Sequence, residues 1–221
     1  MYDEKLPDVI PVFPLSNFII FPNTNVPLNI FEPRYIQMVD DAMKNNKIIG
    51  MVQPKKNGEP NKPEIFEVGC TGKITSYNET EDGRYLIVLN GVSRFRILDE
   101  VIDKKLYRSV KVDFKEFHND LNLIKEDIKF SDLELIFVNL KKLFQRQGYS
   151  INWKDLENQS LDQTINTLSM ASPFSLEEKQ MLLESKDVNS RRKKLEEILR
   201  TYILDDFSNT TVQWSKYLCQ L

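Results

Sequence analysis

The chain has 221 residues, of which 41% are hydrophobic and 29% charged, and its formal net charge at pH 7 is −3. This length suffices for one large or two small domains with a buried core. The balanced charge, without a basic excess in either half, argues against a surface built for nucleic acid. Two cysteines without a C-x-x-C motif and a single histidine argue against a disulfide framework and cannot build a zinc site.

The N-terminal residues M-Y-D-E-K-L-P-D are acidic and contain no apolar core, which predicts that they are not a signal peptide. No window approaches about 18 uninterrupted apolar residues, so no membrane span and no membrane partner are predicted. The sparse use of cysteine is typical of a reducing compartment. We therefore expect a cytoplasmic protein.

The first structured segment, residues 11–35, is rich in apolar residues placed between prolines at positions 11, 14, 22, 27 and 33. Proline fixes its own φ and cannot donate to a central ladder, so this segment predicts short strands separated by bends. A strand is expected at 9–13. Pro33 is placed for the first turn of a helix over 34–43.

The pattern from 48 to 114 predicts further short strands with tight turns. Strands are expected at 48–52, 65–76, 85–89, 92–98 and 107–114. A polar, proline-rich loop is expected at 53–63, a hairpin turn at 79–84 and a second turn at Asn90-Gly91. Together these elements predict a small closed or half-closed β-barrel domain over residues 1–117.

Beyond residue 117 the pattern becomes helical, and residues 118–221 are predicted to form a helical bundle domain. Capping-box patterns begin at Ser131, Ser160 and Ser175. Helices are expected at 132–147, 161–171, 176–185 and 189–207. Residues 121–130 fit either a helix or an extended linker, and the basic run 191–194 is interpreted as a solvated helix face.

Four sequence blocks occur in an order that resembles one known family. They are P-L…F-P…P-L-N-I-F-E-P-R-Y within 14–35, E-V-G at 67–69, D-G-R-Y at 82–85 and N-G-V-S-R-F at 90–95; E-K-Q-M-L-L-E at 178–184 is a looser match. The chain resembles the amino-terminal, substrate-binding domain of Lon proteases. The resemblance implies an α+β fold, with a PUA-like, mostly antiparallel β pseudobarrel and one early helix before a helical bundle. It covers neither the ATPase nor the peptidase module of Lon.

The residues that carry the resemblance are interpreted mainly as structural. Glu32, Arg34 and Tyr35 are expected to fix the corner between strand and helix, and Arg94 to order a turn at the core rim. Gly69, Gly83 and Gly91 are expected to serve backbone geometry. The alternative for the charged residues is contact with a ligand.

A polypeptide-binding surface would be apolar and partly exposed. The candidates are Phe21, Pro22, Val26 and Pro27 in the proline-bounded turn, although Phe21 and Val26 also fit a plain core role. The loop 53–63 and the last helix, as a docking or oligomer face, are further candidates. Partners would be unfolded polypeptides or a partner protein, with the oligomeric state left open.

No catalytic constellation is found in the sequence, which predicts a non-catalytic binding module without cofactors or metals. Adjacent carboxylates such as Asp40-Asp41 are interpreted as solvated. An alternative function is a PUA-like nucleic-acid or nucleotide-binding protein, against which the balanced charge argues. A third is an enzyme that uses His118 in the groove between the two halves.

Overall fold

The computed structural model describes residues 6–59, 62–121, 129, 131, 133–148, 156 and 159–218, without the side chains of 57–59 and 205–218. The chain forms two compact units. One contains Met1–Lys125 and Phe174–Lys186, and the other contains Glu126–Pro173 and Asp187–Leu221. The chain therefore passes between the units three times.

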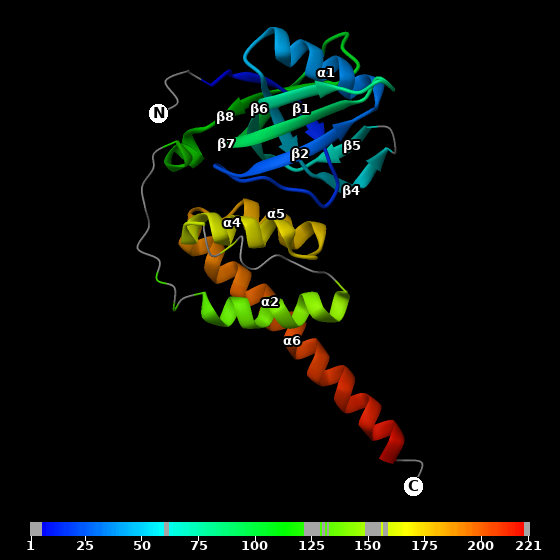
Figure 1. Ribbon diagram of the computed structural model, residues 1–221, viewed down its shortest axis with the longest axis vertical. Helices are drawn as coiled ribbons and strands as arrows, with labels where there is room; N and C mark the ends of the chain where they lie inside the picture. The colour runs from blue at the N-terminus through cyan, green and yellow to red at the C-terminus, as the bar shows by residue number, and fades with distance from the viewer. Residues whose placement is uncertain are drawn as a thin grey trace. The chain divides into compact units, whose positions relative to one another are not determined.

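The first unit is built around a six-stranded sheet (Figure 1). Its strands are β1 (Val9–Pro14), β2 (Asn25–Ile30), β3 (Ile48–Val52), β6 (Val68–Glu79), β7 (Tyr85–Val101) and β8 (Arg108–Asp113). They follow the order β2-β7-β6-β3-β1-β8, and β7 also pairs with β8. That pairing closes the sheet into a barrel and leaves β2 attached to β7. Only β1 and β3 pair in parallel among the strands described. The predicted α+β class with a mostly antiparallel pseudobarrel is confirmed.

The long strand β7 corrects one prediction, because Asn90-Gly91 is not a turn. Both residues lie in mid-strand, where Asn90 pairs with Asn25 and Lys73. A Cβ on Gly91 would lie 1.9 Å from the carbonyl oxygen of Phe21. Glycine is therefore needed for close approach of two backbone segments rather than for a turn.

The predicted loop 53–63 is also wrong, since most of it forms a β-hairpin. The strands are β4 (Pro54–Glu59) and β5 (Lys62–Ile65), which pair with each other in a separate two-stranded sheet. Arg108 Nη1 donates to the carbonyl oxygen of Pro63 at 2.7 Å, and Lys56 pairs with Glu177 at 2.8 Å. These tertiary contacts hold a segment that its polar composition alone would leave as a loop.

The first helix, α1 (Pro33–Lys44), agrees with its prediction and begins after Glu32 with Pro33 in its first turn. It buries Tyr35, Met38, Val39 and Ala42 against the barrel, and Figure 1 shows it lying across the strands. The apolar spacing of i, i+3, i+4 and i+7 produces that buried face.

Asp40 and Asp41 are half-buried and hydrogen-bonded, so they are less solvated than the sequence predicted. Tyr85, at the start of β7, donates its hydroxyl to Asp40 Oδ1 at 3.0 Å. Tyr107, just before β8, donates to Asp41 Oδ2 at 2.7 Å. Adjacent helical residues point about 100° apart, so each carboxylate meets a different strand. Both pairs fasten α1 to the barrel.

A helix from the expected helical part, α5 (Leu176–Leu183), belongs to the same unit as the barrel. Its predicted capping box is confirmed, with Ser175 Oγ accepting from the Glu178 amide and the Glu178 carboxylate accepting from the Ser175 amide. Gln53 Nε2 donates to the carbonyl oxygen of Leu176 and to Gln180 Oε1. These long-range amide contacts bind α5 to the strands.

The second unit contains α2 (Glu134–Gln147), α4 (Leu161–Ala171) and α6 (Val188–Leu218). Both α2 and α4 pack on α6, and their shared interior is apolar. Its buried side chains include Ile136, Leu140, Ile165, Leu168, Leu195 and Leu199. The predicted box at Ser160 is confirmed; the one at Ser131 is wrong, because α2 begins after Leu133 without a side-chain cap. Most of 121–130 lies outside the described residues.

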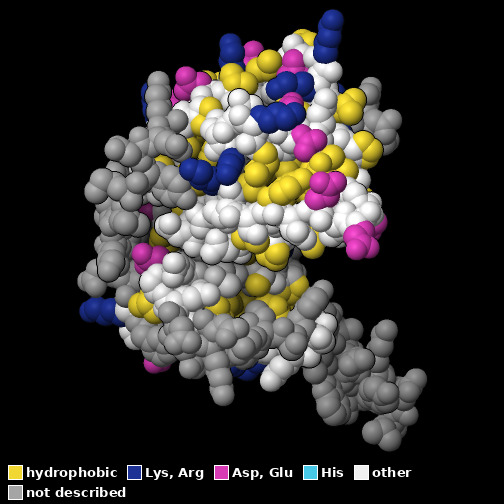
Figure 2. Space-filling model, turned by 45° about the horizontal axis from the view of Figure 1, so that its top comes forward, with side chains coloured by type: hydrophobic (Ala, Val, Ile, Leu, Met, Phe, Trp, Pro, Cys, Tyr) yellow, Lys and Arg dark blue, Asp and Glu magenta, His cyan; other side chains and the backbone are white. Residues whose placement is uncertain are grey.

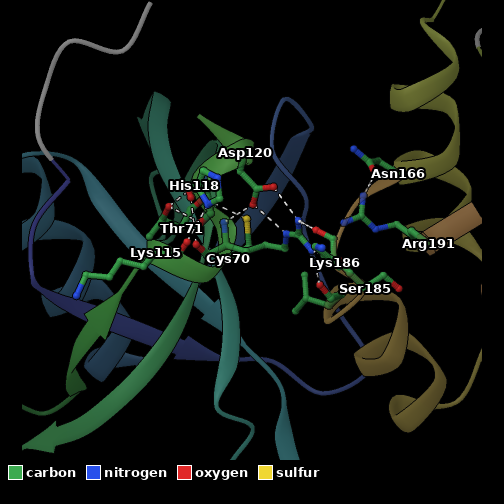
Figure 3. A network of polar contacts seen from close by, with 12 residues as sticks. Cys70, Thr71, Lys115, His118, Asp120, Asn166, Ser185, Lys186 and Arg191 are labelled. Atoms are coloured by element: carbon green, nitrogen blue, oxygen red, sulfur yellow. Dashed lines mark hydrogen bonds and ion pairs between the residues drawn. The ribbon is translucent and has the colours of Figure 1, made fainter. Parts of the chain in front are cut away.

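The basic run of α6 is not wholly solvated, which corrects its interpretation. Arg191 is only 2% exposed and donates from Nη1 to Asn166 Oδ1 on α4 at 2.6 Å (Figure 3). A buried guanidinium can be satisfied in this way because its planar fork offers several donors.

Candidate functional site

The four residues predicted to bind polypeptide do not share one environment. Phe21, Pro22 and Val26 are buried, whereas Pro27 is exposed on β2. Thr24 closes the turn after Phe21, because its hydroxyl donates to the Phe21 carbonyl oxygen at 2.6 Å and accepts from the Phe21 amide at 3.2 Å. The turn is therefore part of the barrel wall, and Pro27 alone of the four is available to a ligand.

Pro27 belongs to an exposed surface across three adjacent strands, which we call the outer face. Its members are Pro27 and Asn29 of β2, Leu86 and the half-buried Val88 of β7, and Ser76 and Asn78 of β6. The register pairs Val88 with Pro27 and Ser76, and Leu86 with Asn29 and Asn78. Directly paired residues project to the same side of a sheet, so the six side chains form two neighbouring rows.

Alternation along the strands produces the outer face. In β2 the exposed residues Asn25, Pro27 and Asn29 alternate with less exposed ones, and in β7 Leu86 is exposed between buried Tyr85 and Ile87. A strand with one face in the core and one toward solvent has this period of two. Pro27 is tolerated because β2 pairs with β7 only and is an edge strand.

The outer face carries no charged side chain, although 29% of the chain is charged. Leu86 is 44% exposed, and Phe31, which follows β2, is 63% exposed. Charged residues lie at its borders, with Lys73 in the next row and the Asp82–Arg84 ion pair in the turn after β6. Depletion of charge within a patch and a charged rim are typical of binding surfaces.

Other exposed apolar side chains are scattered over the described surface. They include Leu98, Ile102, Leu106, Leu135, Val138 and Met181. On the side of the molecule shown in Figure 2, hydrophobic side chains lie in patches among Lys, Arg, Asp and Glu side chains. Single exposed apolar residues are normal in folded proteins, so only their grouping with charge-free neighbours makes the outer face distinctive.

The predicted corner residues Glu32, Arg34 and Tyr35 lie at the start of α1. Arg34 Nε donates to Glu32 Oε2 at 2.9 Å, and both side chains are more than 40% exposed. The Arg34 guanidinium lies 4.5 Å from the centroid of the Tyr35 ring, which packs on Phe13 with a centroid distance of 4.2 Å. Burial raises the pKa of the Tyr35 hydroxyl above its ordinary value.

Two of the three predicted glycines lie where a side chain does not fit. A Cβ on Gly69 would lie 2.6 Å from the Met51 carbonyl oxygen, and Gly91 faces Phe21 in the same way. Gly83 has open space around it and a φ of 78° in the hairpin turn between β6 and β7. That conformation is the one that favours glycine.

Arg94 does more than order a turn at the core rim. Its side chain is 3% exposed and binds the Asp120 carboxylate through Nε and Nη2, each at 2.8 Å. It also donates to the carbonyl oxygens of Leu183, Ser185 and Lys186, at the C-terminal end of α5. Figure 3 shows Asp120, Ser185 and Lys186 gathered around this network. Arg94 therefore holds the residues just before two of the passages between units.

The described residues offer no catalytic arrangement. His118 is exposed in the short helix η1 (Lys115–Asp120), and its Nδ1 lies 2.9 Å from the Lys115 carbonyl oxygen. Within the described part of the chain, no group of three or more His, Cys, Asp or Glu side chains could hold a metal ion. Cys70 is buried, and Cys219 lies outside the described residues. No described helix is long and apolar enough to cross a membrane.

Sequence reasoning missed Leu86, Val88 and Phe31 as members or neighbours of the exposed surface. The signal for Leu86 was available in part, since alternation in Tyr85–Leu89 places it opposite the buried set. Its grouping with Pro27 depends on the pairing of β2 with β7, which no local pattern gives. The exposed apolar residues Ile102 and Leu106 between β7 and β8 were also missed.

The closed six-stranded barrel with α1 across its strands defines an α+β domain. The chain matches the family model of the ATP-dependent protease La (LON) substrate-binding domain over residues 9–201. It belongs to that family.

Curated relatives agree with the family assignment. The chain is 28% identical to a Lon protease of Flavobacterium johnsoniae over 213 residues, which cover 90% of this chain and 24% of the relative. It is also 28% identical to a Lon protease of Cytophaga hutchinsonii over 201 residues, which cover 86% of this chain and 24% of that relative. The chain thus spans about a quarter of the length of these relatives.

The fold resembles the N-terminal domain of Mycobacterium avium complex Lon protease, with a TM-score of 0.59 and 18% identity over 87% of this chain and 98% of that one. A Lon N-terminal domain protein from Xanthomonas campestris gives a TM-score of 0.59 and 19% identity, over 87% of this chain and 97% of that one. At these identities the likeness concerns the fold.

Proposed function

We propose that this chain is a non-catalytic binding module that holds unfolded polypeptide segments, or an exposed segment of a partner protein, on its outer face. The observation that carries the proposal is the charge-free pair of rows around Pro27 and Leu86. Membership of a family described as substrate-binding supports the same function. A cytoplasmic location, expected from the sequence, forms part of the proposal.

The outer face has the chemistry that an unfolded chain requires. Unfolded chains expose apolar side chains and unpaired backbone groups. Leu86, Val88 and Pro27 offer apolar contacts, while the amides of Asn29 and Asn78 can donate to and accept from a peptide backbone. Because the face has no fixed charge, it would accept segments of varied sequence at modest affinity.

Nucleic-acid binding is less well supported by the same surface. A phosphate backbone needs several cations, and the outer face has none among its six residues. The net charge of −3 points the same way.

The test is retention of a heat-denatured protein, compared with its native form, on the immobilised full chain. We expect the denatured form to be retained and the native form to pass. Leu86→Asp should reduce retention about tenfold, because it places a charge at the centre of the face. Leu135→Asp on α2 is the matched control, since Leu135 is 49% exposed. Equal retention of both forms, or equal loss with both variants, contradicts the proposal.

A further inference from the structure

A groove in the first unit is separate from the outer face and shares no residue with it. The groove has a volume of about 360 Å³ and lies between the start of α1, the base of the β4–β5 hairpin and the connection from β7 to β8. This volume is in the range of small-ligand sites. Its lining combines apolar and basic side chains.

The groove has a fixed frame. Arg108 binds Glu100 through Nε at 3.0 Å and Nη2 at 2.9 Å, and Nη1 donates to the carbonyl oxygen of Pro63. Lys62 also pairs with Glu100, at 3.2 Å. These contacts tie β5, β7 and β8 together, so the shape of the groove exists before a ligand arrives. A preformed site loses less conformational entropy on binding.

One wall of the groove presents apolar side chains to solvent. Ile102 is 98% exposed and Leu106 is 64% exposed, and both line the groove. Tyr35 and Val12, which are buried, contribute apolar surface to the lining. Leu106 is held in place by its amide, which donates to Gln37 Oε1 at 2.9 Å. Two exposed aliphatic side chains on an anchored connection are suited to contact apolar side chains of a ligand.

Basic residues outnumber acidic residues in the lining of the groove. Four lining residues are basic (Arg34, Lys62, Lys105 and Arg108) and two are acidic, Glu100 and Asp103. Two further carboxylates lie beside the lining: Glu32 pairs with Arg34, and Asp41 accepts from Tyr107. Both lining carboxylates have partners, since Glu100 binds Arg108 and Lys62, and Asp103 accepts from the Lys105 amide and the Ser109 hydroxyl.

Arg34, Lys62 and Lys105 are the exposed basic side chains of the groove, and Lys62 is paired with Glu100. The Arg34 side chain is 44% exposed, and its partner Glu32 is equally exposed, so an incoming carboxylate can compete for the guanidinium. Lys105 is exposed, and its Nζ lies 5.0 Å from the centroid of the Tyr107 ring. A ligand that complements this groove must combine apolar side chains with negative charge.

We propose that this groove binds extended polypeptide segments in which apolar residues neighbour Asp or Glu, with the apolar side chains on Ile102 and Leu106 and the carboxylates near Arg34 and Lys105. The groove would thereby add a preference for acidic segments to a protein whose outer face has no charge preference. Electrostatic complementarity of this kind contributes specificity and association rate more than raw affinity.

The experiment measures fluorescence anisotropy of three labelled peptides of equal length with the full chain. Their apolar residues are identical, and they differ only in carrying Glu, Gln or Lys between them. At low ionic strength we expect the Glu peptide to bind about tenfold more tightly than the Gln peptide, and the Lys peptide most weakly. Because the groove is open to solvent, this preference should shrink between about 30 mM and about 300 mM salt.

Variants of groove residues test whether the preference for the Glu peptide arises in the groove. The double variant Arg34→Glu, Lys105→Glu should abolish or reverse it, and both side chains are exposed, so the fold should persist. Lys142→Glu on α2 is the control for charge, since Lys142 is exposed in the second unit. The double variant Ile102→Ser, Leu106→Ser should weaken the binding of the Glu peptide and of the Gln peptide to the same extent.

Three results would overturn the assignment. The first is equal affinity for the three peptides, and the second is a preference for the Glu peptide that survives the double charge reversal. The third is tighter binding of a single-stranded oligonucleotide that displaces the Glu peptide. The Leu86→Asp variant separates this site from the outer face: it should leave the Glu-over-Gln preference unchanged while it reduces retention of denatured protein. Loss of the preference in Leu86→Asp would also count against the groove.

Discussion

Arg94 and Asp120 form a two-armed ion pair inside the first unit, with side-chain exposures of only 3% and 9%. The Arg94 amide also donates to Asp120 Oδ2 at 2.9 Å, and the guanidinium lies 4.4 Å from the centroid of the Phe117 ring. The same guanidinium binds carbonyl oxygens at the end of α5, where the helix dipole favours a cation. One side chain thus joins β7, η1 and α5.

We expect Arg94→Met to lower the free energy of unfolding of the first unit by about 3–5 kcal/mol, because it leaves a buried carboxylate and several carbonyl oxygens without their donor. The free energy of unfolding of Arg94→Lys should lie between those of the unchanged chain and Arg94→Met, since lysine keeps the charge but not the bidentate geometry. The measurement is hydrogen exchange of β7 amides during urea titration.

The matched control for this pair is Arg84→Met, which breaks the exposed pair of Arg84 with Asp82. Its effect on the stability of the unit should be far smaller, because exposed pairs are screened by solvent. A double variant of Arg94→Met with Asp120→Asn should cost less than the sum of the single changes. Strict additivity would show that the two residues do not act as a pair.

Gly91→Ala should destabilise the barrel by about 3 kcal/mol or more, because the new Cβ would meet the backbone of Phe21 rather than a flexible side chain. The distances are 1.9 Å to the carbonyl oxygen and 2.8 Å to the carbonyl carbon. The Gly91 amide and carbonyl also bond to Thr24 and Asn23, so the two segments cannot separate freely. Urea unfolding followed by hydrogen exchange of β7 measures the loss.

Gly83→Ala provides the comparison, since nothing lies within 4 Å of the new Cβ and only the positive φ of 78° opposes it. That strain should cost roughly 1–2 kcal/mol. If Gly83→Ala proved the more damaging change, close approach to Phe21 would not be the reason for glycine at position 91.

Local signals in the sequence were sufficient where the structure is decided locally. The capping boxes at Ser160 and Ser175 predicted the starts of α4 and α5, because cap and first turn are a few residues apart. The prolines likewise predicted short strands separated by bends in 11–35, although only β1 was given bounds. Asn90-Gly91 has the local signature of a turn, but the residue that decides its conformation is Phe21, about 70 positions earlier. Sequence alone could not show that contact.

The candidate site was predictable only in part for the same reason. Pro27 is exposed on the edge strand β2, but the sequence did not separate it from Pro22, which is buried. Its neighbours Leu86 and Val88 depend on the register of β7, which shifts at a bulge between Ile74 and Ser76 of β6. The groove depends on Arg108 binding Pro63 and Glu100, contacts between three separate strands.

Removing the tyrosine hydroxyls should loosen α1 from the barrel. Tyr107→Phe and Tyr85→Phe each delete one hydrogen bond to a carboxylate, and each should cost about 1 kcal/mol, because the aspartates retain access to water. Amide exchange in α1 should accelerate more than exchange in β6. Combining Tyr107→Phe with Asp41→Asn should add little to either change, whereas combining it with Asp40→Asn should be additive. The opposite pattern would contradict the pairing of each tyrosine with its own aspartate.

The stability of the turn between β6 and β7 should depend on pH through Asp82. Hydrogen bonds from Arg84, at 2.7 Å, and from Thr80, at 2.5 Å, lower the pKa of Asp82 from 3.8 to about 2. Since the pKa is lower in the folded state, the ionised carboxylate stabilises the turn above pH 3.8, and this contribution is lost as pH falls from 3.8 through about 2.

Carbon-detected NMR should therefore show the Asp82 carboxyl signal of the ionised form down to about pH 3, where an unperturbed aspartate is already mostly protonated. Arg84→Ala should move the midpoint back toward the ordinary value, and Thr80→Ala should do so to a smaller extent, because Arg84 is the larger cause. In thermal melts, Asp82→Asn should be less stable than the unchanged chain at pH 7, and the gap should narrow as the pH falls below 3.8. A midpoint near 3.8 in the unchanged chain, or one that Arg84→Ala leaves in place, would show that the turn does not hold its carboxylate in this way.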